Sequence, residues 1–451
     1  MLRPIHADRR EEVLPVNPLY SGLVPPGGVP RFQLSDKSMS ADAARALIRD
    51  ELILESHARL NLATYCTTWM EPQAKELIAE CLDRNLMDHD QYPQTADIET
   101  RCVNILTNLW NDPDGVGVGC STAGSSEAAM LAGLAMKFSW RNRRRAAGLS
   151  TDRPNLVMST AVHTCWPKFC RYWDVEPRYV PISEPDYCVD PAAVAAACDE
   201  NTIGMVAILG SSALGKYDPV AEISAELDRL QADRDINVPM HVDAAVGGFV
   251  TPFLDPERIW DFRLPRVRSI NASGHKFGLV YPGVGWIVWE DRSDLAEELV
   301  FDCELLGGCV PTFTLNFSRS GAPVVAQYYN FLRLGFEGYH AVQETSREVA
   351  GFLGKEIARI PGLDVIADGT DLPVVGIRVR PGEDAMTVFD IHDRMRRHGW
   401  QIPAYHLPPD LEHIGVLRVV VRHGFSQDMA EHLVRNLRTE VASLLEGSAR
   451  P

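Results

Sequence analysis

The chain has 451 residues, 45% of them hydrophobic and 23% charged, which is ordinary for a soluble globular protein of two or three domains. Its net charge of −17 argues against nucleic acid or an anionic membrane as the main partner. The ten cysteines form no CxxC pair, and no apolar run reaches membrane-spanning length. We therefore expect no metal site, no disulfide framework, no signal peptide and no membrane anchor, and a reducing cytoplasm as the location.

The first part of the chain predicts an arm and a helix ahead of the main domain, over residues 1–60. Residues 1 to about 35 are rich in proline and show no clear periodicity, which is typical of an extended arm. Apolar residues at helical spacing follow Ser40, and either Ser40 or Asp42 could cap a helix there. The next stretch, residues 61–69, is too polar for a core strand and too aromatic for an idle loop.

Small hydroxyl residues open a predicted helix at Gly124-Ser125-Ser126-Glu127. A helix that begins in this way offers backbone N–H groups and the positive end of its dipole, which suits a phosphate. An ordinary N-cap with Glu127 in the first turn is the alternative. The helix should continue to about Trp140, and the arginine cluster after it suits a solvated helix end.

Between Pro154 and about Gly210, short apolar runs alternate with a helical stretch. The runs Leu156–Met158 and Ile203–Leu209 predict strands, and Pro191–Cys198 predicts a helix. Such alternation indicates a parallel sheet with helical crossovers. His163 falls just beyond the first of these strands.

Two charged residues occupy the centre of the chain. Asp243 follows an apolar approach in His241–Ala245, at the expected end of a buried strand, where a carboxylate needs a cationic partner. Lys276 lies among small turn-forming residues between two apolar runs. Pyridoxal phosphate suits both, because its protonated ring nitrogen pairs with an acid and a lysine binds its aldehyde covalently. A capping Asp and a solvated Lys are the alternatives for each residue alone, but the pair is more specific.

The segments His241-Val-Asp-Ala-Ala and Ser273-Gly-His-Lys-Phe-Gly resemble the cofactor motifs of the group II pyridoxal-phosphate-dependent amino acid decarboxylases, in particular the glutamate decarboxylases. The likeness extends from about residue 50 to about residue 430. It implies an α/β protein with the type I aminotransferase-like fold: a large, mostly parallel seven-stranded domain over residues 61–340 and a small α+β domain over residues 341–451. It also implies decarboxylation of L-glutamate to 4-aminobutanoate by at least a homodimer, with a hexamer left open.

The resemblance carries the cofactor site over to individual residues. Two serines match the phosphate-binding turn, a third matches a phosphate contact from the neighbouring subunit, and His163 matches a residue that stacks on the cofactor ring. An ordinary loop histidine remains the alternative for His163. The residues assigned to cofactor binding are Ser125, Ser126, Ser212, Asp243, Ala245, His275, Lys276 and Ser318, and those assigned to catalysis are Lys276, Asp243 and His163.

The resemblance also assigns the substrate pocket to Thr64, Tyr65, Asn85, Asp88 and Arg422. All but the arginine match the pocket for the side-chain carboxylate, and Arg422 matches an arginine near the α-carboxylate. An aspartate beside a carboxylate substrate requires one of the two acids to be protonated, since burying two like charges raises a pKa. A capped turn is the alternative for Asp88 and a surface arginine at a strand end for Arg422.

The turn at Ser212-Ala213-Leu214 departs from the family pattern, which has an aromatic and a hydroxyl residue after the first position. This departure leaves open a related decarboxylase that acts on aspartate or cysteine sulfinate. A catalytically silent scaffold is a second alternative, which the presence of both Lys276 and Asp243 argues against.

Overall fold

The computed structural model of the chain describes residues 32–36, 38–113, 115, 117–304 and 310–448. The chain divides into two compact units, one ending at His57 and the other beginning at Ala58. The first unit contains α1 (Ala41–Leu52), and the Ser40 side chain caps it by accepting a hydrogen bond from the backbone N–H of Ala43 at 3.2 Å. The cap predicted at Ser40 is confirmed. The predicted arm lies outside the described residues except for its last few positions.

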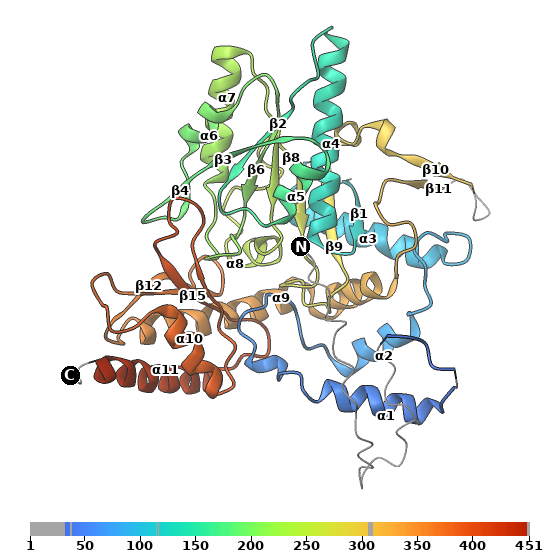
Figure 1. Cartoon of the computed structure of the whole chain (residues 1–451). Helices are drawn as coiled ribbons and strands as arrows, with labels where there is room; N and C mark the ends of the chain where they lie inside the picture. Colours follow the sequence, from blue (N-terminus) through green and yellow to red (C-terminus); the bar gives the residue numbers. More distant parts are fainter. Residues whose placement is uncertain (1–31, 37, 114, 116, 305–309, 449–451) are drawn as a thin grey trace. The chain divides into compact units, whose positions relative to one another are not determined.

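The second unit is built on a seven-stranded sheet with the strand order β1-β9-β8-β7-β6-β2-β3 (Figure 1). Neighbouring strands from β8 to β3 are parallel, whereas β9 runs antiparallel to both β1 and β8. The predicted large and mostly parallel sheet of seven strands is thus confirmed. Its strands are β1 (Val118–Thr122), β2 (Asn155–Ser159), β3 (Glu176–Val180), β6 (Thr202–Ile208), β7 (Met240–Asp243), β8 (Val267–Ala272) and β9 (Gly285–Trp289).

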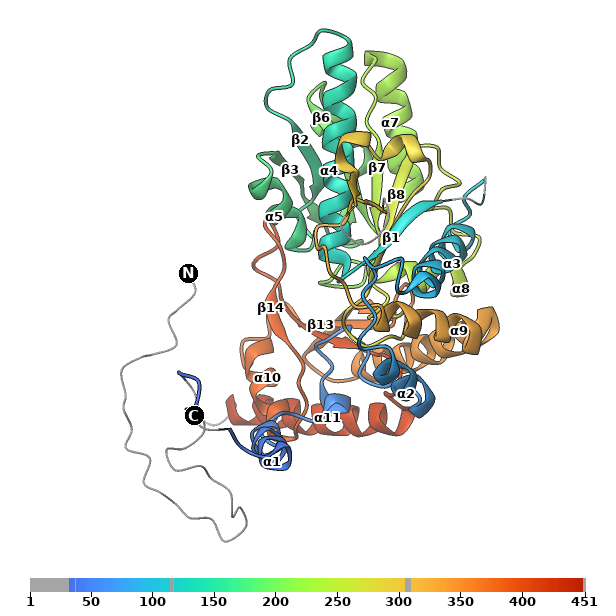
Figure 2. The ribbon, with the colours of Figure 1, turned by 90° about the vertical axis from the view of Figure 1, so that its right-hand side faces the viewer.

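Helices cover both faces of this sheet, which explains why its central strands are continuous apolar runs. Leu156 and Met158 of β2 pack in one cluster with α4 (Ser125–Ala146) and α5 (Cys165–Tyr172). Val157, between them, packs on the other face with α3 (Pro93–Leu109) and α7 (Val220–Arg234). Figure 2 shows the long α4 lying along the strands. The last turn of α4 carries the predicted arginine cluster and ends beyond the predicted position, at Ala146.

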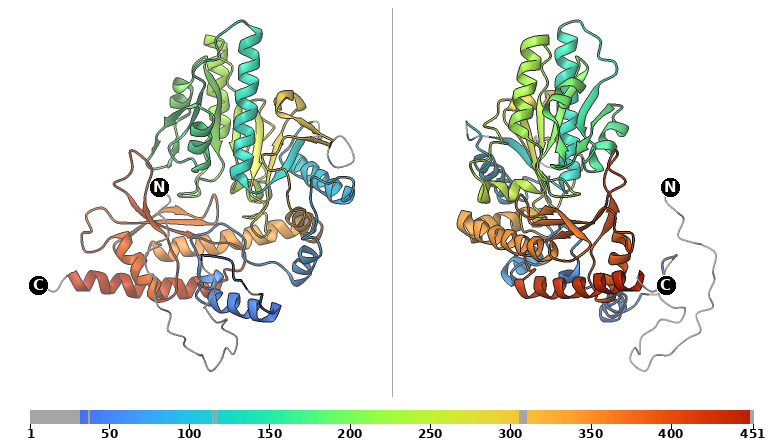
Figure 3. Two further views of the ribbon diagram at one scale, coloured as in Figure 1. Left: turned by 45° about the vertical axis from the view of Figure 1, so that its right-hand side comes forward. Right: turned by 90° about the vertical axis from the view of Figure 1, so that its left-hand side faces the viewer.

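A four-stranded antiparallel sheet follows, with the order β12-β13-β15-β14 (Figure 3). It has its own core with α9, α10 and α11. The predicted boundary at residue 340 falls inside α9, shortly after a break at Gly335, whose φ is 55° and ψ −166°. The limits of the two predicted domains therefore stay a prediction. The elements are α9 (Ala322–Ile357), β12 (Leu363–Asp368), β13 (Val374–Val379), α10 (Val388–Arg397), β14 (Ala404–His406), β15 (Gly415–Val420) and α11 (Gln427–Ser448).

Shorter elements complete the second unit. Two small two-stranded sheets pair β4 with β5 and β10 with β11. The predicted helix at Pro191 is present as α6. These elements are α2 (Pro72–Glu80), β4 (Ile182–Ser183), β5 (Cys188–Val189), α6 (Pro191–Ala197), α8 (Thr251–Leu254), β10 (Phe301–Cys303) and β11 (Val310–Thr312).

A glycine lets α4 and α5 pack at very short distance. A Cβ atom at Gly133 of α4 would lie 2.4 Å from Cε2 of Phe169, whose ring is fully buried on α5. The same short helix carries Trp166 on the sheet-facing side. Gly133 therefore sets how closely the Trp166 helix approaches the strand ends.

The substitution Gly133→Ala should lower the free energy of unfolding by about 1–3 kcal/mol, because the new methyl group must displace a buried aromatic ring. Gly351→Ala in α9 is the matched control, since no atom lies within 4 Å of its hypothetical Cβ. Helix propensity alone should make that variant more stable by about 0.5–1 kcal/mol. Urea unfolding of both variants measures the difference, and equal gains in stability would contradict the close approach of the helices.

Candidate active site

Asp243 ends β7 as a buried carboxylate with three protein donors. Its Oδ1 accepts hydrogen bonds from Nδ2 of Asn271 and the backbone N–H of Ala245, both at 3.2 Å. Its Oδ2 accepts one from Nε1 of Trp166 at 2.8 Å. A carboxylate offers about four acceptor positions. One position on Oδ2 is therefore open to a further donor.

A row of buried polar side chains lies behind this carboxylate. Nε2 of His241 lies 2.7 Å from Oδ1 of Asn271, and Nδ1 of His241 lies 2.7 Å from Oγ of Ser269. The strand register explains the row, because His241 pairs with Ser269 and Asp243 with Asn271 across the parallel strands β7 and β8. Side chains two positions apart on a strand share a face, so the four polar groups meet on the side of Trp166.

Lys276 lies on the loop after β8, half-buried near Asp243 and Arg418. Desolvation lowers the pKa of its amine from the ordinary value, Asp243 opposes that shift, and the Arg418 guanidinium adds to it. The loop curls tightly, since a Cβ at Gly278 would lie 2.5 Å from the carbonyl oxygen of Gly274. Desolvation thus favours the neutral form of this amine more than water would.

Hydrogen bonds from distant segments fix the Lys276 loop. Thr67 binds it twice, through its N–H to the His275 carbonyl at 2.8 Å and its Oγ1 to the Lys276 carbonyl at 2.7 Å. Side chains of α9 donate hydrogen bonds of 2.8–3.1 Å to the carbonyls that follow Lys276, and the donors are Gln327, Asn330, Tyr339 and Gln343. The position of the amine thus depends on residues far away in the sequence.

The predicted phosphate-binding residues gather at the first turn of α4. Oγ of Ser125 lies 2.7 Å from Oγ of Ser273, and Ser126 is exposed beside it. His275 faces Gly124, whose hypothetical Cβ would lie 3.0 Å from the imidazole Cε1. Among the described residues, no side chain caps α4, and the buried Nδ1 of His275 has no hydrogen-bond partner. Burial lowers the pKa of His275 to about 4, helped by the charge of Lys276.

Arg418 of β15 joins the predicted substrate segment to the turn at Ser212. Its guanidinium donates to the Ser212 carbonyl through Nη1 and to the Ala63 carbonyl through Nη2 at 2.5 Å. Its Cζ lies 4.9 Å from the ring centre of Tyr65, and Nζ of Lys276 lies 5.6 Å from the same ring. The hydroxyl of Tyr65 also donates to the Ser212 carbonyl at 3.2 Å. Thr64, Tyr65, Ser212 and Lys276 thus lie in one cluster.

Arg422 lies directly after β15 and is only 7% exposed. It donates to the carbonyls of Thr64, Ala58 and Asn61 and to Oγ1 of Thr68, at 2.6–3.2 Å. A guanidinium has five N–H groups, so one on Nη1 is left for a ligand. His163 is exposed at the opposite end of the cluster, and its Nδ1 accepts a hydrogen bond from the backbone N–H of Cys165 at 3.3 Å. Desolvation lowers the pKa of this imidazole, and the charge of Asp243 opposes the shift.

Asn85, Asp88 and Ser318 form a second group around Arg319. Oδ1 of Asn85 accepts from the backbone N–H of Arg319 at 3.2 Å, directly after Ser318. Asp88 caps its own turn by accepting from Gln91 N–H at 3.0 Å. Within the described part of the chain, no hydrogen bond joins this group to Lys276 or Asp243.

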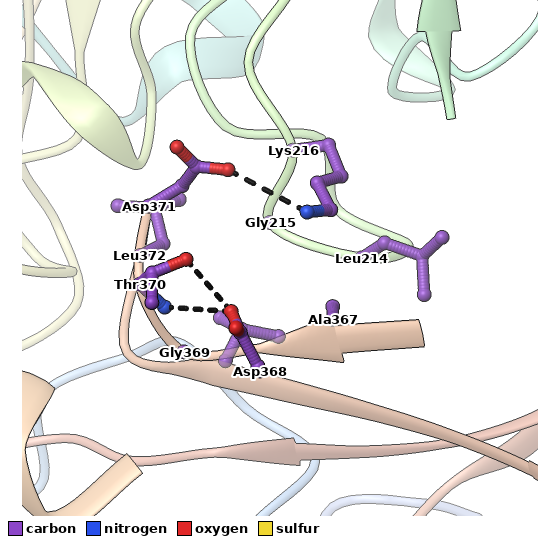
Figure 4. Close-up of a pocket in the computed structure, with 10 residues that line it drawn as sticks. Leu214, Gly215, Lys216, Ala367, Asp368, Gly369, Thr370, Asp371 and Leu372 are labelled. Carbon is purple, nitrogen blue, oxygen red and sulfur yellow. Dashed lines mark hydrogen bonds and ion pairs between the residues drawn. The ribbon is translucent and has the colours of Figure 1, made fainter. Parts of the chain in front are cut away.

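The turn that departs from the family pattern is anchored on the small sheet. Leu214 is 2% exposed and packs against Gly376 of β13, and the Ala213 carbonyl accepts from the Tyr405 hydroxyl at 2.5 Å. Figure 4 shows the shallow hollow beside this turn, where Nζ of Lys216 lies 3.6 Å from Oδ2 of Asp371. None of the assigned site residues lines this hollow, so it is separate from the Lys276 cluster.

Several residues of the cluster are absent from the sequence-based assignment, namely His241, Asn271, Trp166, Thr67 and Arg418. For two of them the sequence did carry a signal. Polar residues alternate with apolar ones in His241-Val-Asp243 and again in Ser269-Ile-Asn271. In adjacent parallel strands this pattern indicates a polar row on one face of the sheet. The other three reach the site by tertiary packing alone.

The sequence profile of the pyridoxal-dependent decarboxylase conserved domain matches residues 36–380. The chain belongs to this decarboxylase family. It is 46% identical to a glutamate decarboxylase from Aliivibrio fischeri over 440 residues, covering 96% of this chain and 94% of that protein. It is also 46% identical to glutamate decarboxylase 5 of Arabidopsis thaliana, covering 93% of this chain and 85% of that protein.

Solved structures of similar chains agree with the fold. Lactobacillus brevis glutamate decarboxylase superimposes with a TM-score of 0.89 at 44% identity, covering 93% of this chain and 96% of that one. A sphingosine-1-phosphate lyase from Burkholderia pseudomallei shares the fold with a TM-score of 0.78 at 24% identity, covering 94% and 95% of the two chains. The type I α/β fold expected from the sequence is therefore confirmed.

The residues of this decarboxylase fit the family's cofactor, pyridoxal phosphate. Asp243 has one open acceptor position for the ring nitrogen, and Lys276 supplies an amine. The unpartnered Nδ1 of His275 and the uncapped start of α4 suit a phosphate. Across the described ranges, no cluster of His, Cys, Asp and Glu could hold a metal ion, and no helix there has the length and hydropathy of a membrane span.

Acid should destabilise the cofactor-free decarboxylase partly through His241. Burial lowers the pKa of His241 to about 4, against about 6.5 in an unfolded chain. The unfolded state therefore binds the proton first, and stability falls as the pH drops through this window. On acidification from about pH 7 to about pH 5, this histidine should lower the free energy of unfolding by about 2 kcal/mol.

Urea unfolding of the apoprotein at both pH values, for wild type and His241→Gln, tests this expectation. The variant should lose about 2 kcal/mol less on acidification than the wild type. His89→Gln, at an exposed position, is the control substitution. Equal losses in all three proteins would show that His241 does not titrate in the expected window.

Proposed function

We propose that the chain catalyses the pyridoxal-phosphate-dependent decarboxylation of L-glutamate to 4-aminobutanoate and carbon dioxide. Similarity to proteins named glutamate decarboxylase, over nearly the whole chain, supports the substrate. The observation that carries the chemistry is the Asp243 carboxylate, which has three fixed protein donors and one open acceptor position near the Lys276 amine. This pair matches the two ends of the cofactor ring.

When bound, pyridoxal phosphate supplies the electron sink that accepts the electron pair left behind by carbon dioxide. Asp243 keeps a proton on the ring nitrogen, which makes that sink effective. Lys276 would hold the cofactor covalently through its amine, whose pKa desolvation lowers. His163 would contact the bound ring, and Ser125, Ser126 and His275 would hold its phosphate. Ser212 and Ala245 would contact the cofactor between these ends.

The substrate is held by the segment that Arg422 and Arg418 fix in place. Thr64 and Tyr65 face the cluster from this segment, and Arg422 contributes its one remaining N–H to the α-carboxylate. Leu214 packs against the small sheet, so its departure from the family pattern serves packing. The departure at Leu214 therefore does not argue against glutamate as the substrate.

The site is proposed to be shared between two copies of the chain. Asn85, Asp88 and Ser318 have no hydrogen bond to the Lys276 cluster of their own chain among the described residues. Ser318 is exposed, and so are its apolar neighbours Leu315 and Phe317, at 47% and 46%. A second copy that covers this segment would bury both apolar side chains and bring Ser318 to the phosphate. We therefore propose at least a homodimer.

We propose a cytoplasmic location, because the cysteines that the structure describes are unpaired. All the cysteines among the described residues are free thiols. Burial raises the pKa of several of them, including Cys170, whose pKa rises to about 12. Unpaired buried thiols are usual in a reducing compartment.

The proposed function is tested by carbon dioxide release from a panel of acidic amino acids. The purified holoenzyme should act on L-glutamate with a kcat/KM at least about 100-fold above that for aspartate or cysteine sulfinate, because a shorter side chain leaves buried polar groups unpaired. Lys276→Ala is the matched control, and it should fold but lose the visible absorbance of the lysine-bound cofactor. Preference for another acid would overturn the assignment of glutamate as the substrate. An unchanged absorbance in Lys276→Ala would overturn the assignment of Lys276 as the lysine that binds the cofactor.

Assembly should depend on the cofactor, since a ligand that binds only the dimer stabilises it by mass action. Sedimentation over a wide concentration range should find holoenzyme dimers at dilutions where the apoenzyme dissociates. Ser318→Ala should reduce the difference in dimer stability between holoenzyme and apoenzyme, because it removes the phosphate contact from the partner. Identical dissociation of holoenzyme and apoenzyme, or a fully active monomer, would rule out the shared site.

A further inference from the structure

The row of polar side chains that ends at Asp243 is unusual in the core of a parallel sheet. Ser269, His241, Asn271 and Asp243 are each at most 6% exposed, and they follow one another across β7 and β8. Their neighbours Val242 and Ile270 pack into the apolar core on the opposite face. Burying polar side chains costs free energy unless each is hydrogen-bonded. Each member of this row has its partner, so the row is complete.

The direction of every hydrogen bond in the row follows from the carboxylate. An ionised carboxylate only accepts, so Asn271 must turn its NH₂ group to Asp243. The Oδ1 of Asn271 then faces His241, and Nε2 of His241 must carry a hydrogen to donate to it. Nδ1 of His241 is left as an acceptor for the Ser269 hydroxyl. The imidazole is thus a neutral Nε2–H tautomer, consistent with a pKa lowered to about 4 by burial.

Packing fixes the row as one unit with the remaining donor. The Trp166 ring lies 5.2 Å from the His241 ring, centre to centre, and its Nε1 donates to the other oxygen of Asp243. Donors therefore reach the carboxylate from β8 and from α5. Together they determine which way its last acceptor position points.

We propose that His241 is a positioning residue for Asp243. It acts through Asn271, whose fixed amide aims the open carboxylate oxygen of Asp243 at the cofactor nitrogen. This proposal deepens the proposed function and rests on it only for the identity of the cofactor. His241 touches neither substrate nor cofactor. Without the N–H donor of His241, the Asn271 amide can rotate and withdraw one of the three donors that hold the carboxylate.

The tautomer can be measured on the unmodified protein. In long-range ¹H–¹⁵N spectra of histidine-labelled apoenzyme, one imidazole absent from His241→Gln should show an acceptor-type Nδ1 and a protonated Nε2. An Nδ1–H tautomer, or an imidazolium near neutral pH, would overturn the proposal. This readout needs no substrate and no activity, so it stands even if the enzyme acts on an acid other than glutamate.

Two substitutions separate positioning from packing. His241→Leu removes the donor, and His241→Gln keeps an N–H group close to the place of Nε2. The leucine variant should lose about 10- to 100-fold in kcat with little change in KM, as is typical when a partner that orients a site residue is removed. The glutamine variant should recover most of that loss. Asp243→Asn is the reference and should lose more in kcat than either.

The cofactor itself provides the last readout. With ¹⁵N in the pyridine ring of the added cofactor, the leucine variant should show a nitrogen signal displaced toward the unprotonated form, and the glutamine variant should resemble wild type. Equal kcat losses in the two variants, or an undisturbed ring signal in a folded leucine variant, would overturn the proposal. If the leucine variant does not fold, the tautomer measurement and the glutamine variant still decide the question.

Discussion

A buried carboxylate at the end of β7 is the constraint on which the rest of this structure depends. Removing a charge from water is expensive unless most of its lone pairs find donors. Asp243 meets that demand with a tryptophan from α5, an asparagine from β8 and its own backbone two residues on. The close contact of α4 with α5 at Gly133 and the register of β7 with β8 both serve this arrangement. The geometry of the sheet is thereby tied to the chemistry at its edge.

The sequence allowed the sheet and the two central charged residues to be predicted because their signals are local. Apolar runs mark β2, β6 and β9, and short motifs surround Asp243 and Lys276. The residues that hold these two in place were not predicted, because Trp166 and Arg418 reach the site only through tertiary packing. The alternation in Ser269-Ile-Asn271 does indicate a polar face, but the role of Asn271 depends on the register with β7, which no local pattern specifies.

The substrate and cofactor residues assigned by resemblance remain predictions, and in the structure they fall into two separate groups. Thr64, Tyr65 and Ser212 share one cluster through Arg418. Asn85, Asp88 and Ser318 form a separate group in the single chain. The resemblance assigns Ser318 to a neighbouring subunit, but it makes no such distinction for Asn85 and Asp88. The domain boundary at residue 340 also stays a prediction, and it falls inside α9, shortly after the break at Gly335.

The anchoring of the Lys276 loop by α9 has a consequence for how the enzyme is made. The carbonyl of Phe277 bonds to Gln343, which lies 66 residues further along the chain. A ribosome must therefore complete β9 and most of α9 before this loop can gain its native hydrogen bonds. Until then the strands β6 to β8 can pair, but the loop that carries the lysine lacks its hydrogen bonds to α9. Binding of the cofactor during synthesis would thus be a late event, which begins only when the second half of the chain has emerged.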